Sequence, residues 1–381
     1  MRGGIVVRLS GYMTRSLVVG VLCIVAVVST GGSPSARAGV PSIPSLAELP
    51  QCVGITQGAT HLVDQTTGGF SVQPPDGFNP VTATDRQLSC YRFPMRPRDG
   101  QALQQWEQAL SHATHYVAWQ FGPATSPTTA TTGSVCCPHP TYAPPSGYPW
   151  SGYGIAASKN GWTNLNWTGV QGQWIVPTGH NYCYNSSTGA QDSPWVGIGG
   201  DSWDTLAGDS HSEYLIQAGT DTTDWPTPVY RFFFEDYPNP QIVTLSPYDP
   251  PVRAGDQAYV SLTYNGNGTT SAFFQNVSTG NYGTDTEQSP LVNLHSAEFI
   301  NEDLPNGWDF MNFGQVPFQL LYASGTWGNN YAISKSLSDS TVKISQFTAW
   351  RNDNSEAVAS PGAINSSGDF TDNYTSSRTG C

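Results

Sequence analysis

Residues 297 to 303 read A-E-F-I-N-E-D, and this stretch has the alternating pattern of a β-strand. Successive side chains of an extended strand point to opposite faces, so Glu298 and Glu302 share one face. A second run, L-I-Q-A-G at residues 215 to 219, places Gln217 on one face of another strand. If both strands belong to one sheet, a carboxyl group and a primary amide converge on its surface. Such a pair can take a proton from water and donate a hydrogen bond to an oxyanion.

Each motif has a simpler explanation when it is considered alone. A glutamate on one face of a strand is usually solvated, and a glutamine flanked by apolar residues is usually a core amide with satisfied hydrogen bonds. The hydrolytic hypothesis therefore depends on further motifs along the chain.

The chain from Trp150 to its end is organised as many short strands. These segments are rich in β-branched and aromatic residues, and clusters of Gly, Pro, Asn and Asp separate them. They comprise residues 172–176, 195–198, 213–218, 229–234, 258–264, 272–276, 297–300, 315–322 and 342–350. The pattern predicts an all-β fold, an antiparallel two-sheet sandwich of the jelly-roll or concanavalin-like kind, with a concave face that can hold a ligand.

The first 38 residues have the features of a secretory signal peptide. Three arginines precede an uncharged apolar stretch at residues 16–28, and an Ala-Arg-Ala site ends at Ala38. We expect cleavage after Ala38 and a secreted, extracellular protein. No later apolar run approaches the ~20 residues that a membrane-spanning helix needs, so no membrane partner is expected.

Residues 39–149 form an N-terminal extension whose composition differs from that of the following residues, and we expect it to be a propeptide. Two stretches rich in Pro, Ser, Thr and Gly, at residues 41–50 and 123–149, are typical of linkers. Between them Leu103, Trp106, Leu110, Ala113 and Val117 recur at spacings of four and three, which predicts one helix that Asp99 can cap. Four arginines precede this helix, and one hypothesis is that this basic patch docks on the acidic remainder and releases in acid. A permanently attached segment is the alternative.

Six cysteines remain once the signal peptide is removed. They are Cys52, Cys90, Cys136, Cys137, Cys183 and Cys381. An even number in an exported chain predicts disulfides, although about fifteen pairings are possible and the sequence does not select one. No C-x-x-C or H-E-x-x-H occurs, so no metal and no other cofactor is expected.

Charge limits the possible partners. The chain has 15 Lys and Arg against 28 Asp and Glu, and only 11% of its residues are charged. Nucleic acid and anionic membranes are therefore not expected partners. Because few cations are present, little positive charge accumulates when carboxylates protonate, so the composition suits an acidic medium. The same composition is common in extracellular proteins that bind or cleave sugars.

Six short motifs occur in one order. They are W-S-G-Y at 150–153, V-Q-G-Q-W-I-V-P at 170–177, W-V-G-I-G-G-D at 195–201, L-I-Q-A-G at 215–219, F-E-D-Y-P at 234–238 and A-E-F-I-N-E-D at 297–303. In this order they resemble the eqolisins, the family of glutamic endopeptidases. The resemblance covers essentially all of residues 150–381.

The resemblance implies a sandwich of two seven-stranded antiparallel sheets with a catalytic Gln and Glu on the concave sheet. Matched by motif, these are Gln217 and Glu302. Glu302 would act as general base toward water and then protonate the leaving amine, while Gln217 would stabilise the oxyanion. The expected protein is thus a secreted acid endopeptidase that acts on protein or peptide substrates, and we expect a monomer.

The supporting residues follow from the same motifs. The resemblance assigns Trp195, Asp201 and Glu235 to substrate binding or to support of the catalytic pair, and Glu298 belongs with them as a second acid on the same strand face as Glu302. A purely structural role for Trp195 and Glu235 is the alternative.

The sequence departs from the family pattern at two positions. Family members usually have an acid where this chain has Gly199, and an aromatic residue where it has Asp236. Loss of the acid at position 199 removes a hydrogen-bonding group near the site. It can change the pH optimum, the specificity or the activity.

Two other function classes compete with the peptidase hypothesis. A β-sandwich glycoside hydrolase would use two carboxyl groups on one strand face, for which Glu298 and Glu302 are candidates. Retaining chemistry needs carboxyl groups about 5 Å apart, whereas strand positions i and i+4 lie about 13 Å apart. A non-catalytic carbohydrate-binding protein is the second alternative, supported by the many aromatic residues.

Overall fold

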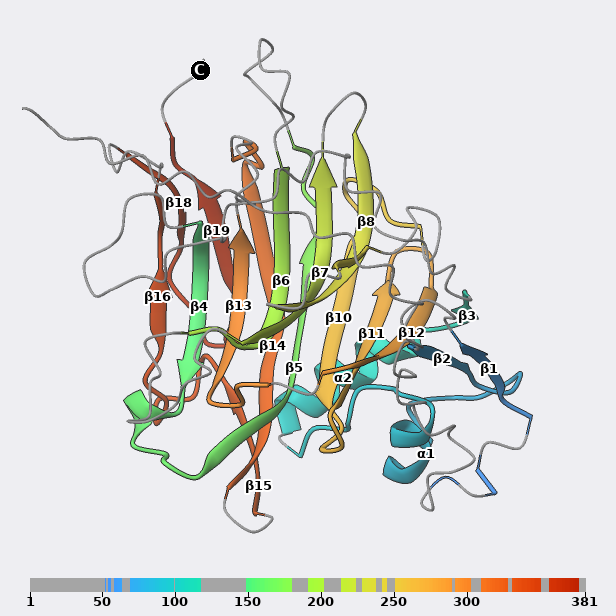
Figure 1. Cartoon of the computed structure of the whole chain (residues 1–381). Coiled ribbons are helices and arrows are strands. Elements are labelled where there is room, and N and C mark those ends of the chain that lie inside the picture. Colours follow the sequence, from blue (N-terminus) through green and yellow to red (C-terminus); the bar gives the residue numbers. More distant parts are fainter. Residues whose placement is uncertain are drawn as a thin grey trace, which may run out of the picture. The chain divides into compact units, whose positions relative to one another are not determined.

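Two antiparallel β-sheets stacked face to face make up most of the computed structural model (Figure 1). The structure describes residues 52, 54–55, 58–63, 69–98, 100–117, 149–179, 191–201, 214–223, 228–237, 242–244, 251–289, 292–302, 310–327, 331–350 and 356–376. All of them belong to the unit Ser42–Cys381, the second of two units in the chain. The expected signal peptide, residues 1–38, lies outside the described residues.

The smaller sheet has seven strands in the order β16-β4-β13-β6-β7-β8-β9. These strands are β16 (Ser345–Phe347), β4 (Trp150–Ala156), β13 (Ser296–Glu302), β6 (Gln191–Gly199), β7 (Leu215–Thr223), β8 (Val229–Tyr237) and β9 (Ile242–Thr244). The two strands that the sequence singled out, β7 and β13, therefore belong to one sheet. A single strand, β6, lies between them.

The larger sheet has twelve strands, ten of which follow the order β1-β2-β12-β11-β10-β5-β14-β19-β18-β17. These are β1 (Thr60–Val63), β2 (Phe70–Gln73), β12 (Asn281–Gln288), β11 (Thr269–Asn276), β10 (Gln257–Tyr264), β5 (Leu165–Ile175), β14 (Gln315–Trp327), β19 (Phe370–Tyr374), β18 (Ala357–Pro361) and β17 (Ala349–Trp350). In addition β15 (Tyr331–Ser336) pairs with β14, and β3 (His115–Tyr116) pairs with β12.

Alternation along the strands separates the core from the two outer faces. On β7, Ile216 and Ala218 point between the sheets and join a core cluster with Trp174 and Phe318 of the larger sheet. Gln217, between Ile216 and Ala218, therefore points to the outer face of the smaller sheet. We call this outer face the site face.

The described residues between 52 and 117 form a part of the domain that we call the lobe. It contains β1, β2, β3 and two helices, α1 (Asp85–Cys90) and α2 (Gly100–Ser111). Both helices lie on the outer face of the larger sheet, behind it in Figure 1. We call this outer face, opposite to the site face, the back face.

The predicted all-β sandwich is confirmed, but several details differ. The resemblance implied two seven-stranded sheets, whereas the larger sheet has twelve strands because lobe strands join it. The extension has a second helix, α1, which the sequence pattern did not reveal because six residues are too few for a periodic stripe. A capping box, in which Thr84 and Gln87 bond each other's backbone N–H, defines its start.

Some predictions fall at the limits of the described residues. One disulfide joins Cys52 to Cys90, both in the lobe, and the other four cysteines lie outside the described residues. The predicted helix ends at Ser111 rather than Val117, since His115 and Tyr116 pair with β12 instead. No helix in the described parts of the chain is long and apolar enough to cross a membrane.

Candidate active site

Strand register fixes the relative positions of the predicted catalytic residues. Gln217 of β7 is opposite Gly197 of β6, and Gly197 is in turn opposite Glu298 of β13. Glu302 is opposite Ser193, four residues further along β6. Gln217, Glu298 and Glu302 thus share the site face, and Glu298 rather than Glu302 is level with Gln217.

The register gives an approximate distance between the two predicted catalytic residues. With about 3.3 Å per residue and about 4.8 Å between strands, the Cα atoms of Gln217 and Glu302 lie about 16 Å apart. Each extended side chain reaches about 5 Å from its Cα, and a hydrogen bond to water is about 2.8 Å long. When both side chains extend toward each other, the interval therefore accommodates one water molecule that contacts both, but not a direct contact.

Trp195 of β6 occupies the level halfway between Gln217 and Glu302. Its ring lies over Gly197, where an added Cβ would be 2.7 Å from Cζ3 of the indole. On the neighbouring strand a Cβ at Gly219 would lie 2.6 Å from Cβ of Trp195 and 2.2 Å from the Pro194 carbonyl oxygen. Both motif glycines are thus required by the close approach of this side chain and its strand.

Two hydrogen bonds hold the predicted catalytic side chains. The indole Nε1–H of Trp195 donates to Glu302 Oε2 over 2.9 Å. On the other side, Gln217 Nε2 donates to Glu235 Oε2 over 2.6 Å, and Glu235 faces Gln217 from β8. Gln217 and Glu302 are 5% and 7% exposed, so both polar groups are largely shielded from bulk water. Each catalytic candidate is thus positioned by one residue that the motifs also singled out.

The two acids of β8, Glu235 and Asp236, have raised pKa values. Burial raises the pKa of Glu235, although the hydrogen bond from Gln217 opposes this rise. Burial also raises the pKa of Asp236 to about 7, and the charge of Glu235 adds to the effect. Both carboxyl groups therefore take up protons at higher pH than an exposed acid does.

Comparison with known proteins identifies the family of the chain. A family model described as the Peptidase A4 family matches residues 148–360, more than half of the chain. The chain belongs to the peptidase A4 family. It is accordingly a glutamic-type peptidase, and the predicted eqolisin membership is confirmed.

Solved structures of similar fold include two peptidases of the eqolisin family. Scytalido-glutamic peptidase with a peptide-based transition state analog is 22% identical at a TM-score of 0.42, covering 60% of this chain and 98% of that chain. SCP-B, an eqolisin in complex with the tripeptide Ala-Ile-His, is 20% identical at a TM-score of 0.40 with the same coverage. A comparison with curated proteins finds no match.

The glycine that replaces the family's usual acid has a backbone conformation that requires glycine in this A4 peptidase. Gly199 has a φ of +84°, and an added Cβ would lie 2.4 Å from the carbonyl oxygens of Asn293 and Tyr214. An aspartate cannot occupy this position without movement of the backbone. Asp201, two residues further, is 1% exposed and is the acid of this motif that remains.

A polar network that the sequence did not suggest lies level with Glu302. Asp221 of β7 accepts hydrogen bonds from Gln191 Nε2 at 2.6 Å and from Ser193 Oγ at 3.4 Å. Arg231, opposite Asp221 on β8, completes it with an ion pair of 2.5 Å. The sequence signal for this network was an acid four residues after Gln217 and a base four residues before Glu235, on two adjacent strands.

A pair of buried carboxyl groups lies on the opposite side of the same strands, between the sheets. Asp192 and Asp372 are both 0% exposed, and Asn301 of β13 interacts with both. Ser151 donates to Asp372 Oδ1 over 2.5 Å. Burial raises the pKa of Asp372 to about 7 and that of Asp192 well above its ordinary value. Because Asn301 precedes Glu302, this cluster adjoins the end of β13 that carries the predicted general base.

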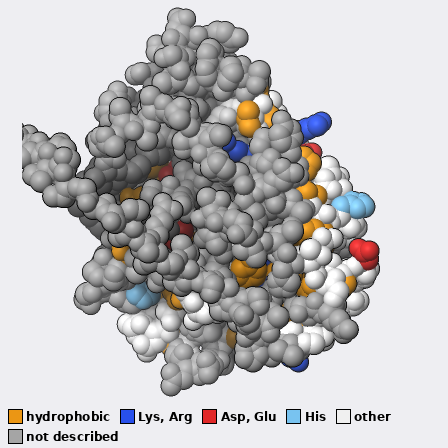
Figure 2. All heavy atoms as spheres, turned by 45° about the vertical axis from the view of Figure 1, so that its right-hand side comes forward, with side chains coloured by type: hydrophobic (Ala, Val, Ile, Leu, Met, Phe, Trp, Pro, Cys, Tyr) orange, Lys and Arg blue, Asp and Glu red, His pale blue; other side chains and the backbone are white. Residues whose placement is uncertain are grey.

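The surroundings of the site are acidic. Figure 2 shows isolated acidic side chains, coloured red, on one face of the molecule. Within the described residues no group of three or more His, Cys, Asp and Glu side chains is arranged to hold a metal ion.

Proposed function

We propose that this peptidase is a secreted, acid-active endopeptidase that cleaves peptide bonds with Gln217, Glu302 and one activated water. The observation that supports the proposal is the arrangement on the site face. The Gln217 amide and the Glu302 carboxyl group lie on one face of one sheet, two strands and four residues apart, and each is held by its own hydrogen-bonding partner.

The first step of the proposed reaction forms a tetrahedral intermediate. The water oxygen attacks the carbonyl carbon of the substrate while its proton passes to a carboxylate oxygen of Glu302. The carbonyl oxygen becomes an oxyanion, which accepts a hydrogen bond from an N–H of the Gln217 amide. The hydrogen bond from Trp195 to Oε2 fixes the orientation of the Glu302 carboxyl group for this proton transfer.

The second step releases the products. The protonated Glu302 gives its proton to the amine nitrogen, the carbon–nitrogen bond breaks, and a carboxylic acid and an amine leave. Glu302 returns to its ionised form, and no covalent acyl-enzyme is formed. The N–H of Trp195 favours this ionised form, which a general base needs in an acidic medium.

Protonation of Glu235 gives a reason for activity in acid. Gln217 Oε1 is buried and has no hydrogen-bond partner among the described residues while Nε2 is bonded to Glu235. A protonated Glu235 can donate to Oε1 once the amide turns over, and both N–H donors of Gln217 then become available to the water and the oxyanion. The raised pKa of Glu235 favours this protonated form in acid.

Export is the remaining part of the proposal. It is supported by the basic and apolar start of the sequence with its Ala-Arg-Ala site, and by the disulfide between Cys52 and Cys90. Appearance of a chain that begins at Gly39 in the culture medium would support it. Retention of an uncut chain inside the producing cell would contradict it.

Digestion of an unfolded protein at pH 3 to 4 tests the catalytic assignment. Wild type, Gln217→Ala and Glu302→Ala are compared with pepstatin present, and Glu107→Gln on α2 serves as a control for loss of an acid remote from the site face. We expect peptides from wild type and Glu107→Gln, and a loss of at least about 10³-fold in both site variants. Full activity of folded Glu302→Ala would rule out the assignment.

The glycoside hydrolase alternative is tested in the same experiment. Glu298 and Glu302 share the site face with Ile300 between them, about 13 Å apart along the strand, which is too far for the carboxyl pair of a retaining glycosidase. We expect no soluble sugar from a polysaccharide under these conditions. Release of sugar that depends on both Glu298 and Glu302 would favour the alternative.

A further inference from the structure

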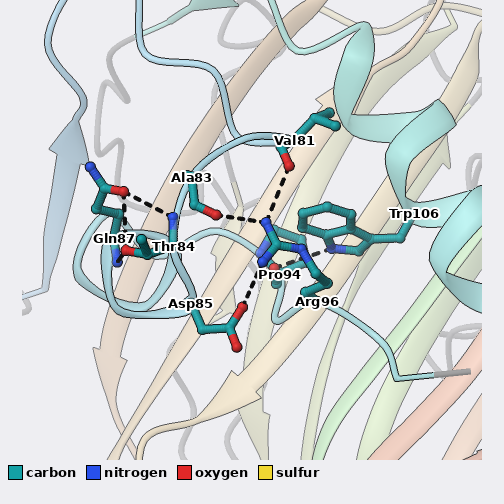
Figure 3. A network of polar contacts seen from close by, with 8 residues as sticks. All are labelled: Val81, Ala83, Thr84, Asp85, Gln87, Pro94, Arg96 and Trp106. Atoms are coloured by element: carbon teal, nitrogen blue, oxygen red, sulfur yellow. Dashed lines mark hydrogen bonds and ion pairs between the residues drawn. The ribbon is translucent and has the colours of Figure 1, made fainter.

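The lobe is held together by its own contacts. Arg96 donates to the carbonyl oxygens of Val81 and Ala83, pairs with Asp85 at 2.9 Å and stacks over the Trp106 ring (Figure 3). Trp106 Nε1 in turn donates to Pro94 O over 3.2 Å. The Cys52–Cys90 disulfide closes a loop with a sequence separation of 38 and so restricts the unfolded chain. Arg96, one of the four arginines of the basic patch, therefore serves the lobe's own structure.

The lobe and the back face share one hydrophobic core. Phe93 of the lobe contacts Phe273 of β11 and Tyr282 of β12, with ring centroids 5.0 and 5.4 Å apart. Trp106 of α2 is fully buried in the same cluster, and Tyr259 of β10 belongs to it as well. Without the lobe these aromatic side chains of the sheet would face water, which costs about 25 cal/mol for each Å² of apolar surface.

Backbone hydrogen bonds join the lobe to strand β12. β2 and β3 both pair with β12. The N–H of Val117 donates to Tyr282 O over 2.8 Å, and those of Thr114 and His115 donate to Gly280 O over 3.0 Å. Deeper in the contact, Gln275 Nε2 donates to the carbonyl oxygen of Ala109 over 3.0 Å. The lobe thus extends the sheet and also covers it.

The larger sheet is locally distorted toward the lobe. Leu320 of β14 has a φ of +57°, which is unfavourable for a residue with a Cβ, and lies at a register shift between Gln319 and Tyr322. This conformation places Leu320 against the lobe cluster instead of the inner core. The strand therefore accepts a strained conformation, which is held by contact with the lobe's apolar surface and by a hydrogen bond of 3.1 Å from the Leu320 N–H to Asp369 Oδ1.

We propose that the lobe is a permanent part of the peptidase domain. It stays bound to the back face by aromatic packing and strand pairing even when the chain is cut between residues 117 and 149. The described lobe contacts the face opposite to Gln217 and Glu302, so it does not cover the site face. This inference departs from the expectation that residues 39–149 are a propeptide that leaves in acid.

Acid is not expected to release the lobe. Arg92, which donates to Asn265 across the contact, keeps its charge because burial lowers its pKa only to about 10. Burial raises the pKa of Tyr116 to about 12, so this residue stays neutral. The groups at the contact whose charge can change in acid are Asp285 and Glu287 of β12 and His112 and His115 beside Gly280. The aromatic packing of Phe93 and Trp106 and the backbone hydrogen bonds to β12 involve none of these four side chains, although Glu287 lies against Gly69 of the lobe.

The test cuts the folded protein and asks whether its parts separate. A recognition sequence for a sequence-specific protease is inserted between residues 118 and 148 of the full chain carrying Glu302→Gln, which limits self-digestion. After cutting, size-exclusion chromatography is run at pH 7 and at pH 4. We expect both pieces to elute together at the position of the uncut protein at both values. A separate lobe peak at either pH would overturn the proposal.

Hydrogen exchange gives a second measurement on the same cut protein. The amides of Thr114, His115 and Val117 donate to β12, so they should remain as protected as in the uncut protein. Complete exchange of these amides within the first time point, with β10 and β11 still protected, would show that the lobe has left. In 6 M guanidinium the two pieces must separate, which confirms that the cut is complete.

Discussion

The two outer faces of this sandwich differ in what covers them and in what they contain. The site face presents an amide, several acids and an indole, and its buried polar groups are held by hydrogen bonds such as that from Trp195 to Glu302. The back face presents the aromatic residues Phe273 and Tyr282 under the lobe. One face therefore has costly buried polar groups, and the other has apolar surface whose burial stabilises the fold.

This difference separates chemistry from stability. Substitutions on the back face are expected to change the free energy of unfolding without changing the rate of the folded enzyme. Substitutions on the site face are expected to do the reverse. The predictions below test this division in order of decreasing expected effect.

The largest effect is expected at the lobe. Trp106→Ala removes a fully buried indole together with its hydrogen bond to Pro94, and should lower the free energy of unfolding by about 3–5 kcal/mol. The rate per folded molecule should not change. Trp327→Ala is the control, since that residue is 37% exposed and its loss should cost less than about 1 kcal/mol. A fall in kcat of the folded Trp106→Ala protein would contradict the expectation that the back face affects stability and not catalysis.

The second effect concerns pH and the carboxyl pair beneath the site face. Asp372 has a folded pKa of about 7 against an ordinary value of 3.8, so the folded state binds more protons than the unfolded state between these values. Stability is therefore highest below about pH 4 and falls up to about pH 7, by on the order of 1.4 kcal/mol for each pH unit. Urea unfolding at pH 4, 5.5 and 7 measures this slope.

Asp372→Asn should reduce that slope, while Asp192 and Asp236 retain part of it because their pKa values are also raised. Asp339→Asn is the matched control. The Asp339 carboxylate is partly exposed, and its hydrogen bonds and ion pair with Lys335 lower its pKa despite some burial. Equal slopes in wild type and Asp372→Asn would show that the buried pair does not govern the pH dependence.

The third effect concerns the glycine that departs from the family pattern. Gly199→Asp restores the usual acid but places a Cβ against two carbonyl oxygens at a φ of +84°, so it should lower the free energy of unfolding by about 1–3 kcal/mol. Gly314→Asp is the control, because Gly314 has a φ of +66° with no atom near its Cβ. It should cost about 1 kcal/mol. A more active and equally stable Gly199→Asp protein would contradict this account.

The smallest effect is expected at Trp195, and it should appear in the rate. Trp195→Phe removes the N–H that donates to Glu302, which should lower kcat about tenfold, or about 1.4 kcal/mol, with little change in KM. Because the ionised form of Glu302 loses a donor, the acid limb of the pH–rate profile should move to higher pH. Trp150→Phe, which changes a ring 5.1 Å away but keeps this hydrogen bond, is the control. An unshifted profile would indicate a structural role for Trp195.

Sequence predicted the site better than its surroundings. The alternation of side chains in A-E-F-I-N-E-D and L-I-Q-A-G indicated which face of its strand Glu302 and Gln217 each occupy. A short stretch of sequence is enough for this, because the period of a strand is two residues. Their meeting on one sheet, with β6 between them, required strand order, which only the family resemblance supplied. Asp192 and Asp372 were missed because neither lies in a motif and their contact depends on the stacking of two sheets.

The lobe was the least predictable part. Its helix α2 was recognisable from its apolar stripe, but nothing local indicated that β2 and β3 would join β12. The sheet residues that contact the lobe, such as Phe273, are single aromatic residues. The side chains of their strand otherwise alternate between the two faces in the usual way. Leu320 was unpredictable for another reason, since a bulge that rotates one leucine depends on the partner that it contacts.

The pairing of lobe strands with β12 has a consequence for the protein in solution. A sheet that ended at β12 would present a row of free N–H and C=O groups, to which a second molecule could add by strand pairing. In acid, where carboxylates lose charge, electrostatic repulsion between molecules weakens and such addition becomes easier. Because β2 and β3 pair with β12, they occupy part of this border and leave fewer of its backbone groups free for such addition.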